Sequence, residues 1–162
     1  MSVLKAKRHE SKAEYVNVAD QIFVETMEFM ARMSFRYQRI LAADTMKLAS
    51  EVLDHAEKAN SIKVTDETSF KIRRAHLLEA RAAVVALDVH MTHVWMILMT
   101  NPQGCFTNTK GETVPPKKAQ GILDGMAESL GEKIDSFKGL CGGVMQSDRK
   151  RFESKEEGCS SA

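Results

Sequence analysis

The chain has 162 residues, a length that suits a single domain with a substantial hydrophobic core. Its formal net charge of +1 excludes a global electrostatic field that would draw the protein onto nucleic acid or membranes. Three cysteines without metal-ligand spacing, and an N-terminus without an apolar signal segment, favour free thiols and a cytoplasmic location.

The first predicted element follows a polar, mostly basic tail (residues 1–12) and is an amphipathic helix over residues 13–33. Its apolar residues recur every three or four positions. If that stripe continued further, it would place the polar Asp44 and Lys47 on the apolar face. We therefore expect a break near Ser34, and one long bent helix through this junction is the alternative.

A second amphipathic helix is predicted for residues 35–60, and a short polar link over residues 61–65 joins it to the next element. Such a short link makes the helices on either side of it antiparallel neighbours. Small residues lie on the stripes that would then face each other, which permits close approach of the two backbones. They are Ala42, Ala49 and Ala56 on the second helix, and Ala75, Ala82 and Ala86 on the third.

The third predicted helix, residues 66–99, contains no Gly or Pro, and we expect the other helices to pack around it. Thr65 is a candidate N-cap, and Asp66 and Glu67 place negative charge on the first turn, where the helix dipole favours it. From Ala82 onward the helix is apolar on nearly every side, which predicts burial within this chain or against another chain. The expected core stripe is Ile72, Ala75, Leu78, Ala82, Ala86 and Val89, and the expected polar face carries Lys71, Arg74 and Arg81.

A loop rich in Gly, Thr, Asn and Pro is predicted for residues 101–116, and it leads into a fourth helix over residues 116–138. Three glycines inside this helix each cost roughly 1 kcal/mol relative to Ala, so it depends on packing. The glycines at 139, 142 and 143 are expected to end it. A short basic helical piece around residues 147–152 and a disordered tail over residues 153–162 would follow.

These elements predict an all-α protein, an up-down antiparallel four-helix bundle over residues 13–152 with short polar tails. No membrane span is predicted, since Asp88, His90 and His93 interrupt the most apolar segment. The residues expected in the core are Phe23, Met30, Met46, Leu53, Leu78, Val85, Leu130 and Ile134.

Histidines raise the question of a metal site, because His90 and His93 lie near one helical face and His55 follows Glu51 and Asp54. Carboxylate-bridged metal bundles use Glu-x-x-His pairs, and neither helix contains one. An interface role for His90 and His93, and a solvated face around Glu51, explain the pattern better. Cys141, beside two glycines, has no placed His partner. We therefore predict no metal, no cofactor and no catalytic residue.

The nearly all-round apolar half of the third helix has more apolar surface than three partner helices would cover. An uncovered remainder would form a large apolar patch, which monomers seldom tolerate. A closed homo-oligomer is therefore expected. The residues predicted at its interface are Val94, Trp95, Ile97 and Leu98.

Basic residues form local clusters despite the low net charge. Arg36 and Arg39 lie at the first helix junction, and Arg73, Arg74 and Arg81 lie on the first part of the third helix. Such clusters can bind phosphates, and these five arginines are the predicted nucleic-acid-binding residues. The alternative is a solvated face with ordinary ion pairs.

Three segments resemble the four-helix bundle family of diversity-generating retroelements, the accessory variability determinant (Avd) and its relatives encoded in ribosomal RNA intervening sequences. The first, residues 32–37, reads RMSFRY and is similar to a Ser-aromatic-Arg junction of that family. The second, residues 51–60, reads EVLDHAEKAN, and the third, residues 73–81, reads RRAHLLEAR. The resemblance covers roughly residues 20–100.

The resemblance implies an up-down bundle that assembles into a homopentameric barrel. It also implies a non-enzymatic accessory protein that binds a reverse transcriptase and its template RNA, or an RNA/DNA hybrid, during mutagenic retrohoming. The alternative function is a helical protein–protein interaction module of a mobile element that does not bind nucleic acid.

Overall fold

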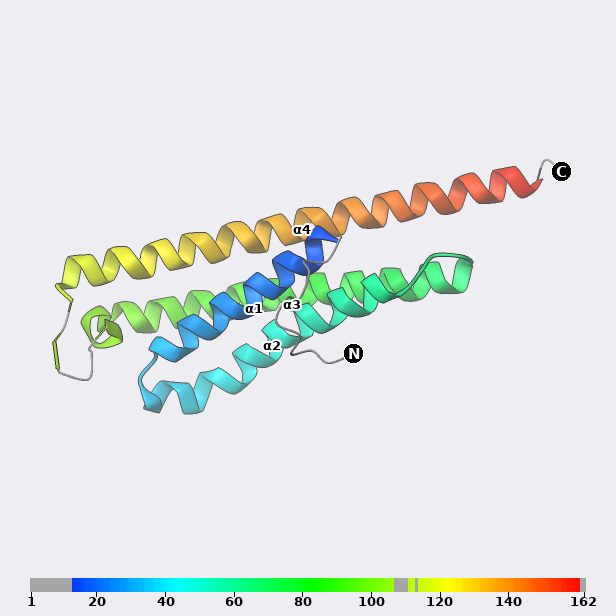
Figure 1. The fold of residues 1–162 in the computed structure, drawn as a ribbon. Coiled ribbons are helices and arrows are strands. Elements are labelled where there is room, and N and C mark those ends of the chain that lie inside the picture. The colour runs from blue at the N-terminus through cyan, green and yellow to red at the C-terminus, as the bar shows by residue number, and fades with distance from the viewer. Residues whose placement is uncertain (1–12, 107–110, 113, 161–162) are drawn as a thin grey trace, which may run out of the picture.

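The computed structural model describes residues 13–106, 111–112 and 114–160, with side chains described up to residue 154. The described part of the chain forms four α-helices and a short 3-10 helix, and it contains no strand, which confirms the all-α prediction (Figure 1). The bounds are Glu14–Arg32 for α1, Phe35–Ser61 for α2, Glu67–Met99 for α3, Pro102–Phe106 for η1 and Pro116–Ser160 for α4.

The four helices form an up-down bundle in which consecutive helices run antiparallel (Figure 1). Helix α1 packs on α2 and α4, and α3 also packs on α2 and α4, whereas α1 and α3 lie diagonally opposite with little contact. Each helix therefore has two neighbours, an inward face and an outward face. The predicted four-helix bundle is confirmed, while the N-terminal residues 1–12 lie outside the described part.

The break between α1 and α2 lies at Met33 and Ser34, which both adopt extended backbone conformations. The alternative of one long bent helix is therefore wrong. The Gln38 side chain crosses the junction, because its amide Nε2 donates a hydrogen bond of 2.9 Å to the Met30 carbonyl. Ser34 occupies the N-cap position of α2 without making a side-chain capping bond, and the first turn of α2 has no acidic residue.

The N-terminus of α3 is capped by Asp66 rather than by the expected Thr65. The Ser69 amide donates to the Asp66 carboxylate at 2.8 Å, and the Asp66 amide donates to the Ser69 hydroxyl at 3.0 Å. This reciprocal capping box satisfies two free helix amides. Hydrogen bonds from the Ser69 backbone and from Thr65 hold the pKa of Asp66 below its usual range.

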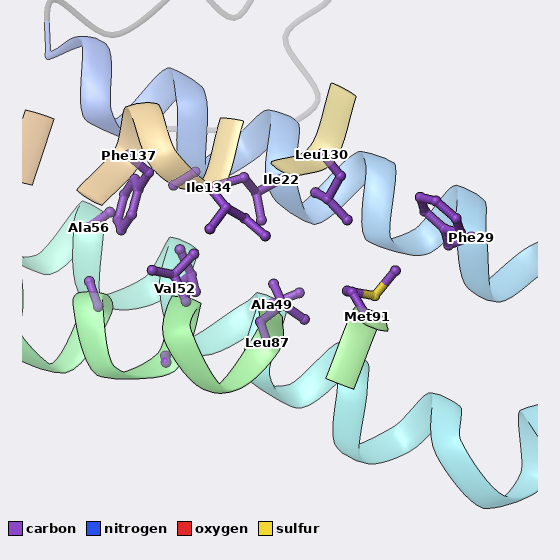
Figure 2. Packing of buried hydrophobic residues seen from close by; sticks show 14 of the residues in the cluster. Ile22, Phe29, Ala49, Val52, Ala56, Leu87, Met91, Leu130, Ile134 and Phe137 are labelled. Atoms are coloured by element: carbon purple, nitrogen blue, oxygen red, sulfur yellow. The ribbon is translucent and has the colours of Figure 1, made fainter. Parts of the chain in front are cut away.

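The core runs along the bundle axis and receives side chains from all four helices (Figure 2). Met30, Leu130 and Ile134 are buried as predicted, and Phe23, Met46 and Leu53 are half-buried. On α2, Ala49 and Ala56 are buried as predicted, but the small residues expected to face them from α3 were misassigned, because Ala75 and Ala82 are exposed and Ala80 and Ala83 are buried instead. The expected burial of Leu78 and Val85 is wrong, because these side chains are 48% and 52% exposed.

Helix α4 continues through the glycines that were expected to end it at residue 138, and its backbone is helical to Ser160. A Cβ atom at Gly139, Gly142 or Gly143 would meet nothing within 4 Å, so no steric contact requires glycine there. The helix continues past these glycines because Asp148 and Phe152, in its later part, contact α3. The expected disorder of residues 153–162 is therefore wrong up to residue 160, and residues 161–162 lie outside the described part.

Candidate functional site

The outward face of α3 carries a row of exposed apolar side chains. Val85 and Val89 are both more than half exposed, and the neighbouring Ala82 is also exposed. The row recurs at spacings of three and four, so it follows one side of the helix along most of its length. Its members are Ile72, Ala75, Leu78, Ala82, Val85, Val89 and Met96, and we call this row the α3 outer face.

The inward face of α3 is a second apolar stripe, offset from the first. It includes Leu77, Ala80, Val84, Leu87, Met91, Val94 and Leu98, all of them buried. The sequence stripe assigned to the core is therefore the outer face, because both sides of this helix are apolar and either one satisfies the helical periodicity. Sequence periodicity alone does not distinguish the two.

Two of the predicted interface residues belong to the bundle core. Val94 is 1% exposed and Leu98 is 4% exposed, so their assignment to an exposed oligomer interface is wrong. Trp95 and Ile97 are half-buried, and the Trp95 indole Nε1 donates a hydrogen bond of 3.1 Å to the Asp124 carboxylate of α4. The exposed apolar surface of α3 is the α3 outer face.

By length and composition, α3 is the one described helix that is apolar enough to cross a membrane, and a third of its most apolar window is buried in the bundle. A single helix of this kind is weak evidence for a membrane span, because the core helices of bundles share its composition. The apolar character of α3 instead divides between the bundle core and the α3 outer face.

The prediction that Arg73 lies on the solvated face of α3 is wrong. Its guanidinium Nε donates a hydrogen bond of 2.6 Å to the carboxylate of Asp148 on α4, and this carboxylate is buried. Its Nη1 donates to the carbonyls of Ala59 and Ile62, at 3.3 and 3.0 Å, at the C-terminal end of α2. Arg73 thus joins α2, α3 and α4 through its Nε and Nη1 donors.

The other predicted nucleic-acid-binding arginines fall into two separate places. Arg36 and Arg39 are exposed at the start of α2, whereas Arg74 is exposed and Arg81 half-buried on the first half of α3. Because α2 and α3 are antiparallel, the first pair and Arg74 lie near opposite ends of the bundle. The length of α2 from Arg39 to its end is about 33 Å at about 1.5 Å per residue. One chain therefore presents two basic sites rather than one continuous track.

The site at the start of α2 combines its arginines with exposed apolar rings and chains. Phe35 is 74% exposed and Ile40 is 65% exposed. The Arg39 guanidinium carbon lies 5.9 Å from the centroid of the Phe35 ring, in a cation–π arrangement. A shallow groove is lined by Phe35, Arg36, Arg39 and Ile40, and we call these four residues the junction patch.

A histidine pair that sequence reasoning missed joins α2 to α3. The Nδ1 atoms of His55 and His76 lie 3.0 Å apart, so one ring donates and the other accepts a single shared hydrogen bond. His55 lies six residues before the end of α2 and His76 lies nine residues after the start of α3, so spacing around the turn does not pair them and no local sequence signal would have done so. Burial, together with the positive charge on His55 and Lys58, lowers the pKa of His76.

The described residues contain no cluster of three His, Cys, Asp or Glu side chains that could hold a metal ion. The His55–His76 pair supplies two nitrogen ligands, and His90 and His93 lie on the other half of α3. Cys141 is buried, and burial raises the pKa of its thiol to about 12, so the nucleophilic thiolate is disfavoured at neutral pH.

A mostly apolar pocket between α3 and α4 also lacks free polar groups that converge on a ligand. Its lining includes Asp88 and Trp95. The Asp88 carboxylate faces Lys138 at 3.4 Å, and the Trp95 indole is bonded to Asp124. The surface features that remain available to another molecule are therefore the α3 outer face and the basic sites.

Comparison with protein-family models finds no match, and comparisons with curated proteins and with solved structures find no similar protein. The fold therefore rests on the structure itself. The resemblance to the accessory variability determinants stays a prediction from the sequence.

Proposed function

We propose that this chain is a non-enzymatic, oligomeric accessory protein that binds nucleic acid. Its ligand would be a template RNA or an RNA/DNA hybrid, and its protein partner a reverse transcriptase of a diversity-generating retroelement in the cytoplasm. The observation that carries the proposal is the α3 outer face, because an exposed apolar row along a helix is a surface for association.

Association with further copies of the same chain is the simplest way to cover this row. Every copy carries the same row, and closed symmetric assemblies are the common outcome for soluble homo-oligomers. Small residues in the row, Ala75 and Ala82, let another helix approach closely. The sequence resemblance supports a homopentamer as the specific form of this assembly.

Assembly also supports nucleic-acid binding by a chain of low net charge. A ring would repeat Arg36, Arg39 and Arg74 once per copy, which adds positive sites without raising the charge of one chain. Lys and Arg that neutralise phosphates release bound counterions, so binding of this kind weakens steeply as salt rises. Arg73 is excluded from this set because it is largely buried and its guanidinium pairs with Asp148.

The assembly is tested by replacing Val85 and Val89 with Lys. Both side chains are exposed in the single chain, so the double variant is expected to keep its helical circular dichroism and to dissociate in multi-angle light scattering. The matched control is Val24→Lys, a change at an exposed valine on α1. A wild-type protein that is monomeric at micromolar concentration would contradict the proposal.

Nucleic-acid binding is tested by filter-binding titration of a structured RNA at low and moderate salt. Reversing Arg36 and Arg39 to Glu is expected to reduce binding strongly, while Lys47→Glu, further along α2, is the control. If the wild-type protein binds no RNA even at low salt, the favoured function becomes a protein–protein interaction module. That second candidate is supported by the apolar character of the α3 outer face.

A further inference from the structure

The junction patch presents an aromatic ring to solvent at the first residue of α2. Phe35 is the most exposed of the large hydrophobic residues in the described part of the chain. Ile40 extends the apolar surface by one turn, and Tyr37 beside it is also exposed. A ring this open contributes little to the bundle, because hydrophobic stabilisation scales with the apolar area removed from water.

The arginines around this ring keep their hydrogen-bond donors free. Arg39 lies over the Phe35 ring, and no hydrogen bond or ion pair of Arg36 or Arg39 is found among the described residues. Two arginines on other helices are engaged instead: Arg32 lies 4.6 Å from the centroid of the Phe106 ring, and Arg73 pairs with Asp148. The guanidinium groups of the junction patch can therefore donate hydrogen bonds to an external anion.

We propose that the junction patch binds single-stranded nucleic acid, with an unpaired base stacked on the Phe35 ring and the flanking phosphates on Arg36 and Arg39. This inference rests on the proposed nucleic-acid function and names its ligand class and site. In a duplex the base faces are already stacked, whereas a single strand offers them to an exposed ring. Arginine suits this role because its guanidinium both pairs with phosphate and stacks on aromatic faces.

A second protein is a poorer occupant of the same surface. Covering the junction patch with an apolar partner would remove two unpaired guanidinium groups from water, which is costly without matching carboxylates. A polyanion with flat apolar rings satisfies both parts of the patch. Charge complementarity therefore favours nucleic acid at this end of the bundle, while the α3 outer face is the surface suited to protein contact.

The test is fluorescence anisotropy with a short single-stranded oligoadenylate and with an RNA hairpin stem of similar length. The wild-type protein is expected to prefer the single strand. Phe35→Ala is expected to weaken single-strand binding about tenfold, and Phe35→Trp is expected to retain it. Phe35→Leu keeps an apolar side chain without a ring and is expected to resemble Phe35→Ala. Ile40→Ala is the matched apolar control with a smaller effect.

Stacking has its own spectroscopic readout. A 2-aminopurine base within the single strand is expected to change its fluorescence on binding to the wild-type protein, and to lose that change with Phe35→Ala. Because Phe35 is exposed, each variant is expected to keep the helical circular dichroism and the oligomeric state of the wild-type protein.

The possible failures are distinguishable. If Phe35→Ala binds the single strand as the wild type does, while Arg36→Glu with Arg39→Glu abolishes binding, the stacking inference is overturned and the proposed function stands. A preference for the hairpin stem overturns it equally. If Phe35→Ala changes the oligomeric state, the patch is a protein contact. If the wild-type protein binds no nucleic acid at low salt, both the inference and the proposed function fail.

Discussion

At the end of the bundle formed by the α2–α3 turn, an arginine and two aromatic rings pack between helices, whereas at the α1–α2 junction Phe35, Arg36 and Arg39 are exposed to solvent. At the turn, Arg73 binds Asp148, and the Phe70 and Phe152 rings stack with centroids 5.0 Å apart. At the junction, Phe35 and Arg36 are exposed. The first group stabilises the fold, and the second is available to a ligand.

The largest expected difference between the two ends concerns their arginines. Asp148→Ala leaves Arg73 largely buried without its carboxylate, and we expect it to lower the free energy of unfolding by about 3 kcal/mol. Arg36→Ala at the junction is expected to change it by less than about 0.5 kcal/mol. Urea denaturation followed by circular dichroism measures both. Equal effects would show that the pair at the turn contributes no specific stability.

The aromatic rings of the two ends give the next comparison. Phe70→Ala removes a half-buried ring and its stacking on Phe152, and a loss of about 1–2 kcal/mol is expected from burial and stacking together. Phe35→Ala is expected to leave the urea midpoint unchanged, because the ring is already exposed. A clear destabilisation by Phe35→Ala would mean that the junction ring has a structural role.

The N-caps at the two ends also differ, because the side chain that caps α3 makes capping hydrogen bonds and the one at the start of α2 makes none. Asp66→Ala removes the capping box of α3 and is expected to lower the melting temperature by about 2–4 °C. Ser34→Ala removes an N-cap side chain that makes no capping bond, so its melting temperature is expected to match the wild type. Differential scanning calorimetry on both variants checks this, and the comparison fails if Ser34→Ala is the more damaging change.

The smallest expected effect is a pH dependence at the turn end. The pKa of His76 in the folded chain lies below its ordinary value of 6.5, so the unfolded chain takes up the proton first as pH falls. Stability is therefore complete above about pH 6.5 and decreases slightly as pH falls below it. The groups that face this pair are Lys58 and Glu79.

Thermal melts of the wild type between pH 5 and pH 8, roughly the range in which histidine changes charge, measure this dependence. A His55→Gln variant is expected to show a weaker dependence, because it removes one of the two positive neighbours that lower the pKa of His76. The variant with Gln at both His90 and His93 is the matched control and is expected to follow the wild type. An unchanged slope in His55→Gln would contradict the coupling of the two rings.

Local periodicity was sufficient to predict the number and order of the helices and the approximate bounds of the first three. It did not determine which side of α3 faces the core, because α3 has two apolar stripes with the same helical spacing. The buried stripe contains Leu77, and the exposed stripe contains Leu78. The continuation of α4 was missed because its stability past Gly139 depends on Asp148 and Phe152. Those contacts join segments far apart in the sequence, and no local pattern reports them.

The candidate site residues also divide into those that a local sequence pattern identifies and those that depend on tertiary contacts. Arg36 and Arg39 were predicted as available basic residues, and their exposure agrees with that role. Arg73 has the same sequence character, but its partner Asp148 lies 75 residues away, so only the tertiary structure identifies it as a structural residue. The His55–His76 pair was missed for the same reason, because its two rings come from different helices and no local pattern pairs them.

The length of α4 affects how the size of this protein must be measured. Its 45 residues give a rod of about 68 Å at about 1.5 Å per residue, and it projects beyond the other three helices (Figure 1). A compact chain of 162 residues would have a radius of gyration of only about 15 Å. The projecting rod increases hydrodynamic drag, so gel filtration calibrated with spherical standards is expected to overestimate the mass. Sedimentation equilibrium does not depend on shape and gives the true subunit number.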